Sequence, residues 1–403
     1  MRIVLFNAHK EFWFGKTLKV WLYRMPWKPK YAFIIREHLR NYGPIHILLS
    51  PHRPSLVLQL LGWLNVKVWA VVNGYNPLGI KVLFEPEQLK ADDALLVMYV
   101  GNFVMYSGPR NVEELVLWLN RSPAKIFLNV NHYPYHADNA HRLLQGLRFS
   151  HFWAENDLRQ NSNFFRKHFA NFRQDFMVTP FAVRADFKFS KNYALRRNAA
   201  IAVGSLSLKM TNDSAFVEHF GHDNLQPIRD AIYCGIPERY ANNLYAVVSH
   251  INEGGAARSV RDAANLLLAI RNWLHNVVRS GQRKYHALDM CELFNSYMVH
   301  VVGEEIVGLP GIGFAEGMMC GSALIGIDDP MYRIHGLEPD IHYIAYDGGY
   351  EHMLARLKQA LKDQDFLSQV AAAGYEHARK HFTEAAVFSK LIEGVFRRVQ
   401  GNL

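Results

Sequence analysis

Residues 307–326 read VGLPGIGFAEGMMCGSALIG and combine a glycine-rich turn, one acidic residue and a run of small residues. Gly311 and Gly313 let the backbone approach a ligand at places where a Cβ atom would collide with it. A helix that begins near Phe314 would direct free N–H groups and the positive end of its dipole toward an anion. Glu316, in the first turn of that helix, can accept hydrogen bonds from both hydroxyls of a ribose. The stretch predicts a nucleotide site at a strand-to-helix turn; the alternative is that the glycines make only the turn.

The residues that follow are typical of one kind of domain. Residues 316–321 read EGMMCG, with Glu, a small residue, Met, Cys and Gly in a recurring order. This motif resembles the donor-nucleotide motif of glycosyltransferases with the GT-B fold, above all of the retaining families. The sequence at 336–347, 373–374 and 381–383 looks like the usual end of such a donor domain. The resemblance implies an α/β protein with two Rossmann-like domains that face each other across a cleft holding the active site.

Length and patterning agree with two domains. With 403 residues, half of them hydrophobic, the chain can bury two cores. Apolar runs of strand length alternate with helix-like segments such as 31–42 and 112–120, which predicts parallel sheets covered by helices. The runs assigned as strands in the first domain are residues 3–6, 45–49, 66–72, 94–100, 126–130 and 149–153.

A domain boundary is predicted where a strand-like stretch at 175–183 is followed by polar, basic residues. Residues 1–183 are assigned to an acceptor domain and residues 198–383 to a donor domain, as the resemblance implies. A helical pattern covers 384–402. In GT-B enzymes such a final helix crosses back to the first domain, so the same placement is implied here.

Composition narrows the class of protein. Three scattered cysteines are too few for a disulfide framework or a zinc site, and no signal-peptide pattern precedes the first predicted strand, so we expect a cytoplasmic protein. Polar residues interrupt the longest apolar run, 55–72, which therefore falls short of a membrane span. The formal charge of +9 and the pI near 9.3 favour anionic partners. Basic residues are spread through both halves without a recognition motif, so nucleic acid is not expected as a partner.

One segment predicts peripheral contact with the inner membrane. Residues 10–31 read KEFWFGKTLKVWLYRMPWKPKY, in which tryptophans alternate with lysines and arginines. This composition is that of an interfacial patch on an anionic membrane. The alternatives are a half-buried helix with a basic rim, or a platform on which tryptophan faces stack against acceptor sugars.

The residues expected to bind phosphate differ from those of the retaining GT-B enzymes. Retaining GT-B enzymes follow the first strand of the donor domain with an Arg and then a Lys, which together neutralise a nucleotide diphosphate. Here Gly204 is followed by Ser205 in place of the Arg, while Lys209 is present. One cation suits a donor with a single phosphate, such as a cytidine monophosphate sugar. Gly308 stands where these families carry a first Glu, which also argues against a common hexose donor on a diphosphate.

With these departures the chain resembles the bacterial β-Kdo transferases. Those enzymes move 3-deoxy-D-manno-oct-2-ulosonic acid from CMP-Kdo to a surface glycan with retention, through an aspartate nucleophile. The resemblance implies that role for Asp230, in QPIRDAIYCG at 226–235, although an Asp at such a place is often a first-turn helix residue or a partner of an Arg. The implied acceptor is a lipid-linked O-antigen or capsule chain.

Other side chains are candidates for supporting roles. Glu155 follows a predicted strand and can act as acid or base for the acceptor hydroxyl; the alternative is a solvated strand-end acid. His250 can bind phosphate or a sugar carboxylate as a cation, and His132 with Tyr133 can orient the acceptor. Ser322 can donate to phosphate or ribose, or can simply let a helix pack closely.

No Asp-x-Asp metal motif stands at a strand end, so we expect transfer without metal or other cofactor, with the helix dipole, Lys209 and His250 supporting the leaving phosphate. Three alternatives to the Kdo transferase stay open. They are a hexosyltransferase that uses a UDP- or GDP-sugar, a nucleotide-sugar epimerase of GT-B fold, and a catalytically degenerate GT-B module that serves as a glycan- or membrane-binding scaffold.

Overall fold

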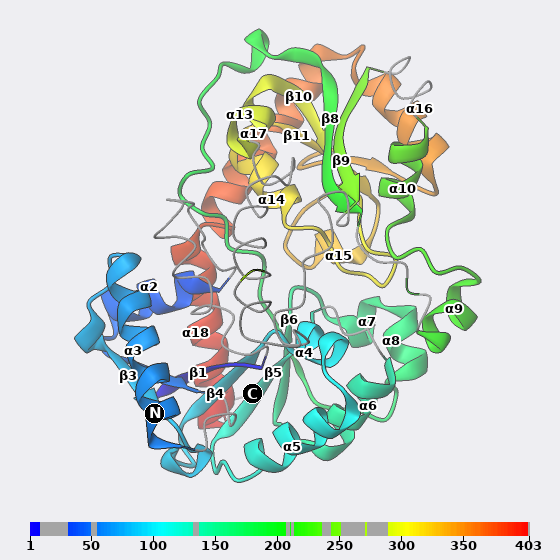
Figure 1. Ribbon diagram of the computed structural model, residues 1–403. Helices are drawn as coiled ribbons and strands as arrows, with labels where there is room; N and C mark the ends of the chain where they lie inside the picture. Colours follow the sequence, from blue (N-terminus) through cyan, green and yellow to red (C-terminus); the bar gives the residue numbers. More distant parts are fainter. Residues whose placement is uncertain are drawn as a thin grey trace. The chain divides into compact units, whose positions relative to one another are not determined.

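The computed structural model describes residues 1–8, 31–49, 55–131, 137–206, 210, 213–235, 243–250, 271 and 289–401. The chain divides into two compact units. The first consists of Met1–Ala182, Met210–Asp223 and Glu384–Leu403, and the second of Val183–Lys209 and Asn224–Thr383. Each unit holds a parallel sheet with helices, so the α/β prediction is confirmed (Figure 1).

The described residues of the first unit form a seven-stranded parallel sheet in the order β3-β2-β1-β4-β5-β6-β7. Its central strands are buried and apolar because helices cover the sheet. The strands are β1 Ile3–Asn7, β2 Ile45–Leu48, β3 Ile80–Leu83, β4 Ala94–Met98, β5 Lys125–Asn129, β6 His151–Ala154 and β7 Phe176–Val178. Its helices are α2 Ala32–Asn41, α3 Leu56–Val72, α4 Val100–Tyr106, α5 Pro109–Leu119, α6 Ala137–Gly146, α7 Leu158–Asn161, α8 Asn163–His168, α9 Ser214–Phe220 and α18 Glu384–Gln400.

One predicted strand of this unit is wrong. Residues 66–72 are the second half of α3, a helix of 17 residues that starts at Leu56. Ser55 caps this helix, because its Oγ accepts the N–H of Leu58 at 3.3 Å. Valines alternate with other residues at the end of this helix, which resembles a strand pattern. The strand that follows in the sheet is β3, which comes after the 3₁₀ turn Pro77–Gly79.

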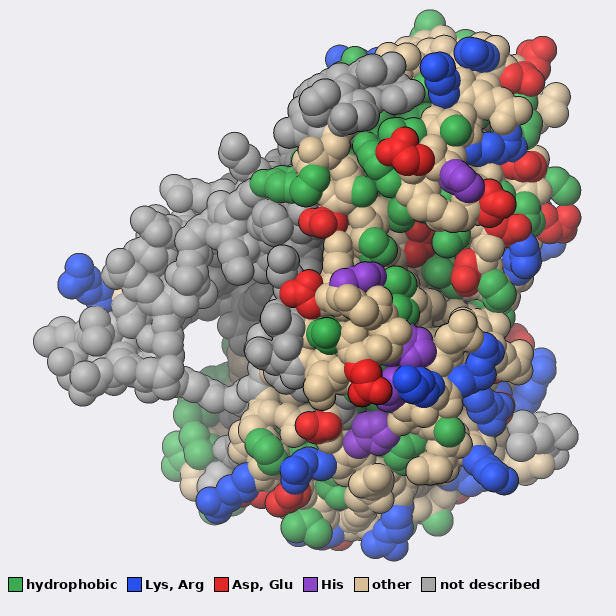
Figure 2. All heavy atoms as spheres, turned by 90° about the vertical axis from the view of Figure 1, so that its right-hand side faces the viewer, with side chains coloured by type: hydrophobic (Ala, Val, Ile, Leu, Met, Phe, Trp, Pro, Cys, Tyr) green, Lys and Arg blue, Asp and Glu red, His purple; other side chains and the backbone are tan. Residues whose placement is uncertain are grey.

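One face of the described residues is mixed in character. Figure 2 shows acidic, basic and apolar side chains interspersed on the face that it presents. Such mixing is normal for a folded protein, since apolar atoms make up about half of an ordinary surface.

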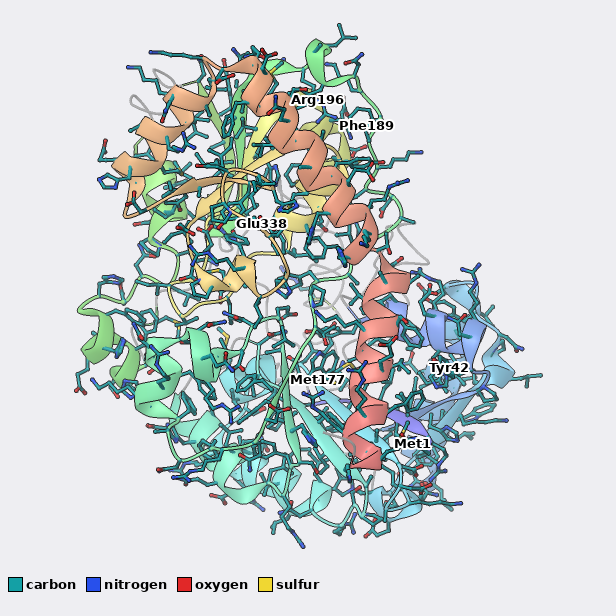
Figure 3. The ribbon with its side chains drawn as sticks, turned by 180° about the vertical axis from the view of Figure 1, so that it is seen from behind. Met1, Tyr42, Met177, Phe189, Arg196 and Glu338 are labelled. Atoms are coloured by element: carbon teal, nitrogen blue, oxygen red, sulfur yellow. The ribbon has the colours of Figure 1, made fainter. Side chains whose placement is uncertain are left out.

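Helix α18 belongs to the first unit although it ends the chain. Its apolar face, which includes Phe388 and Leu391, is buried in the core of that unit. Tyr42, at the end of α2, packs on this helix with its ring centroid 6.0 Å from that of Phe388 (Figure 3). The Lys125 ammonium at the start of β5 donates to the carbonyl oxygen of Arg398 at 3.0 Å, which satisfies the carboxyl end of α18.

The described residues of the second unit form a five-stranded parallel sheet in the order β12-β11-β10-β8-β9. Its strands are β8 Arg197–Leu206, β9 Leu244–His250, β10 Tyr297–Val301, β11 Ala323–Ile327 and β12 Ile344–Tyr346. Its helices are α10 Pro227–Cys234, α13 Met290–Ser296, α14 Gly313–Met319, α15 Pro330–Arg333, α16 Tyr350–Ala360 and α17 Gln364–His381.

The basic segment before β8 packs on the second unit through Arg196. This buried guanidinium donates to the carbonyl oxygens of Phe294 at 3.1 Å and Cys320 at 2.7 Å. The Phe189 ring lies 5.1 Å from its Cζ (Figure 3). Gly321 faces the same ring, and a Cβ atom on it would lie 2.4 Å from Phe189 Cδ2. Its φ of 70° also favours glycine there. Arg196 therefore holds the amino edge of the second sheet together.

Candidate functional site

The strand order of the second unit marks one place in its sheet where a ligand can bind. After β8 the chain adds β9 on one side, and it then crosses to place β10 on the other side. Ligands of open α/β sheets bind outside the carboxyl ends of the strands at such a switch point. The candidate site therefore lies beyond the carboxyl ends of β8 and β10.

Strand register opens space at this switch point. β10 ends at Val301, which pairs with Ala202 of β8. β8 continues for four more residues and there pairs with β9 alone, from Val203 to Leu206. Gly204 consequently has no strand beside it on the β10 side.

The side chain of Arg229 fills this corner. It comes from α10, is 8% exposed, and donates from Nε to the carbonyl oxygen of Val302 at 2.6 Å. Three glycine backbones surround it. A Cβ atom on Gly204 would lie 2.9 Å from Arg229 Nε, one on Gly303 2.6 Å from Cγ, and one on Gly311 2.7 Å from Nη2. The three glycines thus leave the space that the buried Arg229 side chain occupies.

Sequence reasoning considered Arg229 only as a neighbour of Asp230. The cation was sought directly after β8, where Ser205 replaces the Arg of the families that the chain resembles. The structure instead brings a guanidinium to that strand end from a helix. Arg229 is therefore a further cation at this strand end, beside the predicted Lys209. The available signal was an Arg in the first turn of a helix that follows a polar loop.

Glu316 lies in the first turn of α14, as its position in the motif predicts. Burial raises the pKa of this carboxyl to about 7, an effect that Arg184 opposes and Asp186 reinforces. A carboxyl group with this pKa exchanges its proton near neutral pH. It can then accept two hydroxyl hydrogen bonds in its ionised form or donate one in its neutral form.

Three other residues of the motif serve the core. The Phe314 ring is fully buried, 5.3 Å from the ring centroid of Tyr332 and 5.5 Å from that of Phe382, so its side chain is not available to a ligand. Gly317 faces the buried His300, whose ring atoms would lie 2.4 Å from a Cβ atom there. Gly313 packs against Val302, where a Cβ atom would lie 3.2 Å from Cγ2. These small residues bring α14 close to the sheet.

Ser322 lies at the opposite edge of the sheet. Its hydroxyl is 3.3 Å from the carbonyl oxygens of both Tyr297 and Met298, the first residues of β10. The residue is 1% exposed. The structure therefore separates Ser322 from the candidate site, and the close-packing alternative fits its position.

Asp230 stands in the first turn of α10, one residue after Arg229. Its Oδ2 accepts a hydrogen bond from Asn224 Nδ2 at 3.0 Å. This is the arrangement of a first-turn helix acid, and its role as nucleophile stays a prediction. His250 is the last residue of β9 and Ser205 the second-last of β8, but the side chains of both lie outside the described part of the structure. Lys209, His132, Tyr133 and residues 10–30 also lie outside the described residues.

A polar cluster occupies the carboxyl edge of the first sheet. Glu155, which follows β6, is buried, and its Oε1 accepts the Tyr31 hydroxyl at 3.2 Å. Asn129 and Asn131 donate to the same hydroxyl at 3.2 and 2.9 Å. Burial and the nearby Glu155 carboxylate raise the pKa of Tyr31. Glu155 is thus a buried, hydrogen-bonded acid. The cluster was not found from the sequence, because Tyr31, Asn129 and Asn131 come from other segments of the chain.

A second buried acid, Glu304, ties together strand ends of the second unit. Its Oε1 accepts the Tyr332 hydroxyl at 2.6 Å and the N–H of Ile327 at 3.1 Å, and its Oε2 accepts the Tyr346 hydroxyl at 3.3 Å. These bonds link the carboxyl ends of β10, β11 and β12. Glu304 therefore anchors the loop between β10 and α14 to the neighbouring strand ends.

Other features of the described residues lie apart from the switch point. A hollow of about 680 Å³ is lined by His342, Glu376, His377 and His381, around the carboxyl end of α17. Within the described ranges, no group of His, Cys, Asp and Glu side chains could hold a metal ion. The same ranges contain no helix long and apolar enough to cross a membrane.

Comparison with known proteins identifies the fold. No protein-family model matches the chain, and no curated protein matches it. HepE of Anabaena in complex with UDP-glucose is similar over 98% of this chain and 100% of its own, with 10% sequence identity and a TM-score of 0.53. The HepE complex with UDP gives the same identity and coverage and a TM-score of 0.52. A glycosyltransferase from Rickettsia africae covers 100% of this chain and 99% of its own, with 11% identity and a TM-score of 0.49. The likeness to HepE shows the fold, which is GT-B.

Proposed function

We propose that this chain is a glycosyltransferase that uses a nucleoside diphosphate sugar, with a UDP-hexose as the first candidate. The observation that carries the proposal is the Arg229 guanidinium among Gly204, Gly303 and Gly311 at the switch point. A guanidinium can hold two phosphate oxygens at once. The GT-B fold and its likeness to a UDP-glucose complex support the same class of donor.

The chemistry that the site would supply is stabilisation of the leaving group. During transfer the acceptor oxygen bonds to the anomeric carbon, the bond from that carbon to the β-phosphate oxygen breaks, and UDP leaves with the electron pair. Arg229 would neutralise the charge that develops on this oxygen. Lys209, in the segment after β8, stays the predicted second cation. Glu316 would accept the ribose hydroxyls, and Glu155 stays the predicted base for the acceptor proton.

The CMP-Kdo transferase is retained as the second candidate. Ser205 and Gly308 favour it, because they stand where groups that bind a diphosphate donor are expected, and Arg229 would offset the first of these losses. Retention through Asp230, a lipid-linked surface polysaccharide as acceptor, peripheral membrane contact of residues 10–31 and a cytoplasmic location all stay predictions.

Thermal unfolding with added nucleotides tests this proposal, since a ligand stabilises the state that binds it. UDP, GDP, UMP and CMP are compared at equal concentration. We expect UDP or GDP to raise the midpoint more than either monophosphate, and Arg229→Met to remove that difference. Arg110→Met is the matched control, because Arg110 is 90% exposed on α5. Stabilisation by CMP alone would favour the Kdo donor, and no response to any nucleotide would favour the scaffold.

A further inference from the structure

Helix α3 is apolar on both of its faces. Gly62, Val66, Trp69 and Ala70 face the first unit and are buried in it. A surface helix of a soluble protein normally carries polar side chains on its other face. In α3 that face is also apolar, so the helix buries one apolar side and exposes another.

The exposed side is a continuous row of large side chains, here called the α3 stripe. It consists of Leu56, Leu60, Leu64, Val68 and Val71, which follow at intervals of three or four residues. Their exposed fractions run from 44% for Val68 to 83% for Leu56. Four further large apolar side chains of the same helix are more than a third exposed. A patch of this kind marks an interaction surface, because folding of the unit does not require it.

The charge of the surrounding sequence identifies the kind of partner. Residues 1–84 contain 12 Lys and Arg but only Glu11 and Glu37 as acids, a formal charge of +10. The whole chain has 45 basic and 36 acidic residues, so residues 85–403 contain 33 and 34, a charge of −1. The entire positive charge of the protein thus belongs to the segment that contains the stripe. A second copy would bring the same positive charge against it, whereas an anionic lipid surface would attract it.

The geometry of α3 suits a helix that lies in the plane of a membrane surface. Its 17 residues extend about 25 Å, and it is too short and too firmly packed on one side to cross a bilayer. Lys67 is its one charged residue, and the ammonium turns away to the carbonyl oxygens of Pro77 at 2.5 Å and Ile80 at 2.6 Å. Trp63 adds an exposed indole to the same helix.

We propose that α3 is an interfacial helix whose stripe seats the first unit on an anionic lipid surface. The stripe would enter the boundary between headgroups and acyl chains, and the basic residues of the same segment would contact the headgroups. This inference does not depend on the donor specificity proposed above, because it concerns the other unit.

Vesicle co-sedimentation of the full chain tests the inference. Phosphatidylcholine vesicles are compared with vesicles that contain about a third phosphatidylglycerol, at low and high salt. We expect binding to the anionic vesicles that weakens with salt. The Leu60→Glu/Leu64→Glu pair should lower the partition constant at least about 10-fold, because it removes two apolar side chains that the lipid would bury. Leu117→Glu, on the 70% exposed Leu117 of α5, is the matched control and should bind like the parent.

The outcomes separate the possible occupants of the stripe. Thermal unfolding checks that each variant folds, and a Leu60→Gln/Leu64→Gln pair is measured beside the Glu pair so that a folding defect does not decide the result. Absence of binding to either vesicle, or equal binding by parent and stripe variants, would overturn the inference. So would a parent dimer in light scattering that the stripe variants convert to a monomer, since the stripe would then be covered by a second copy.

Discussion

Two buried arginines stand at opposite edges of the second sheet, and their surroundings differ in kind. At the amino edge, Arg196 donates to main-chain carbonyl oxygens and lies between the rings of Phe189 and Tyr193, 5.1 and 5.5 Å from its Cζ. At the carboxyl edge, Arg229 donates to Val302 and lies against glycine backbone. Aromatic side chains pack on the cation at the amino edge. At the carboxyl edge the backbone of three glycines packs on the cation instead. The difference favours a structural role for Arg196 and supports the phosphate-binding role proposed for Arg229.

The largest effect on stability is expected from Arg196→Met. The substitution leaves the carbonyl oxygens of Lys191, Phe294 and Cys320 without their buried donor, which costs about 3 kcal/mol of unfolding free energy. Urea unfolding measures the loss. UDP affinity of the folded protein should be unchanged, because the arginine lies at the edge away from the switch point. If the Arg196→Met variant were as stable as the parent but bound UDP weakly, the amino edge would be the one that binds the ligand, contrary to the prediction.

The next effect is on ligand affinity and is expected from Arg229→Met. Loss of a charge-assisted hydrogen bond to phosphate should raise the Kd for UDP about 10- to 100-fold, with a smaller change for UMP. Isothermal titration measures both. Arg229→Lys, which keeps the charge but not the fork of donors, should fall between parent and Met variant. Equal losses for UDP and UMP would place the cation away from the β-phosphate.

Much of the fold could be predicted because its signals are local. Buried parallel strands appear as apolar runs, and helices between them show their own spacing, so alternation along the chain indicates the two sheets. The error at 66–72 has a physical cause in α3. A helix that is apolar on both faces has no polar face to reveal its period, and its valines then resemble a strand.

The site could be predicted only where it is contiguous in sequence. The turn and Glu316 follow from residues 307–326, because a glycine-rich turn and a first-turn acid are local features. Arg229 reaches Gly204 only because β8 runs past the end of β10 and α10 returns beside it, which no local pattern reports. The contact of Tyr31 with Glu155 spans 124 positions and was missed for the same reason.

A pH dependence of about 10-fold in UDP affinity is expected from Glu316. Its pKa is raised to about 7, so near pH 6 about a tenth of the carboxyl is ionised in the free protein and near pH 8 about nine-tenths. Acceptance of ribose hydroxyls needs the ionised form, so affinity should rise with pH across this window. Glu316→Gln should keep only the dependence that comes from the phosphate of UDP. Affinity that falls with pH in the parent alone would show that the neutral acid binds the ligand.

The smallest effect is expected at Ser322, and it separates the two edges most directly. Ser322→Ala removes a buried hydroxyl that is 3.3 Å from the carbonyl oxygens of Tyr297 and Met298, at the cost of about 1 kcal/mol of unfolding free energy. UDP affinity should stay within about twofold of the parent, because the serine lies at the amino edge with the Arg196 network. The motif places Ser322 six residues after Glu316, yet the helix and turn between them carry it to the other end of the sheet. A loss of UDP affinity without a loss of stability would mean that the ligand extends past α14, and the division between a structural and a binding edge would then fail.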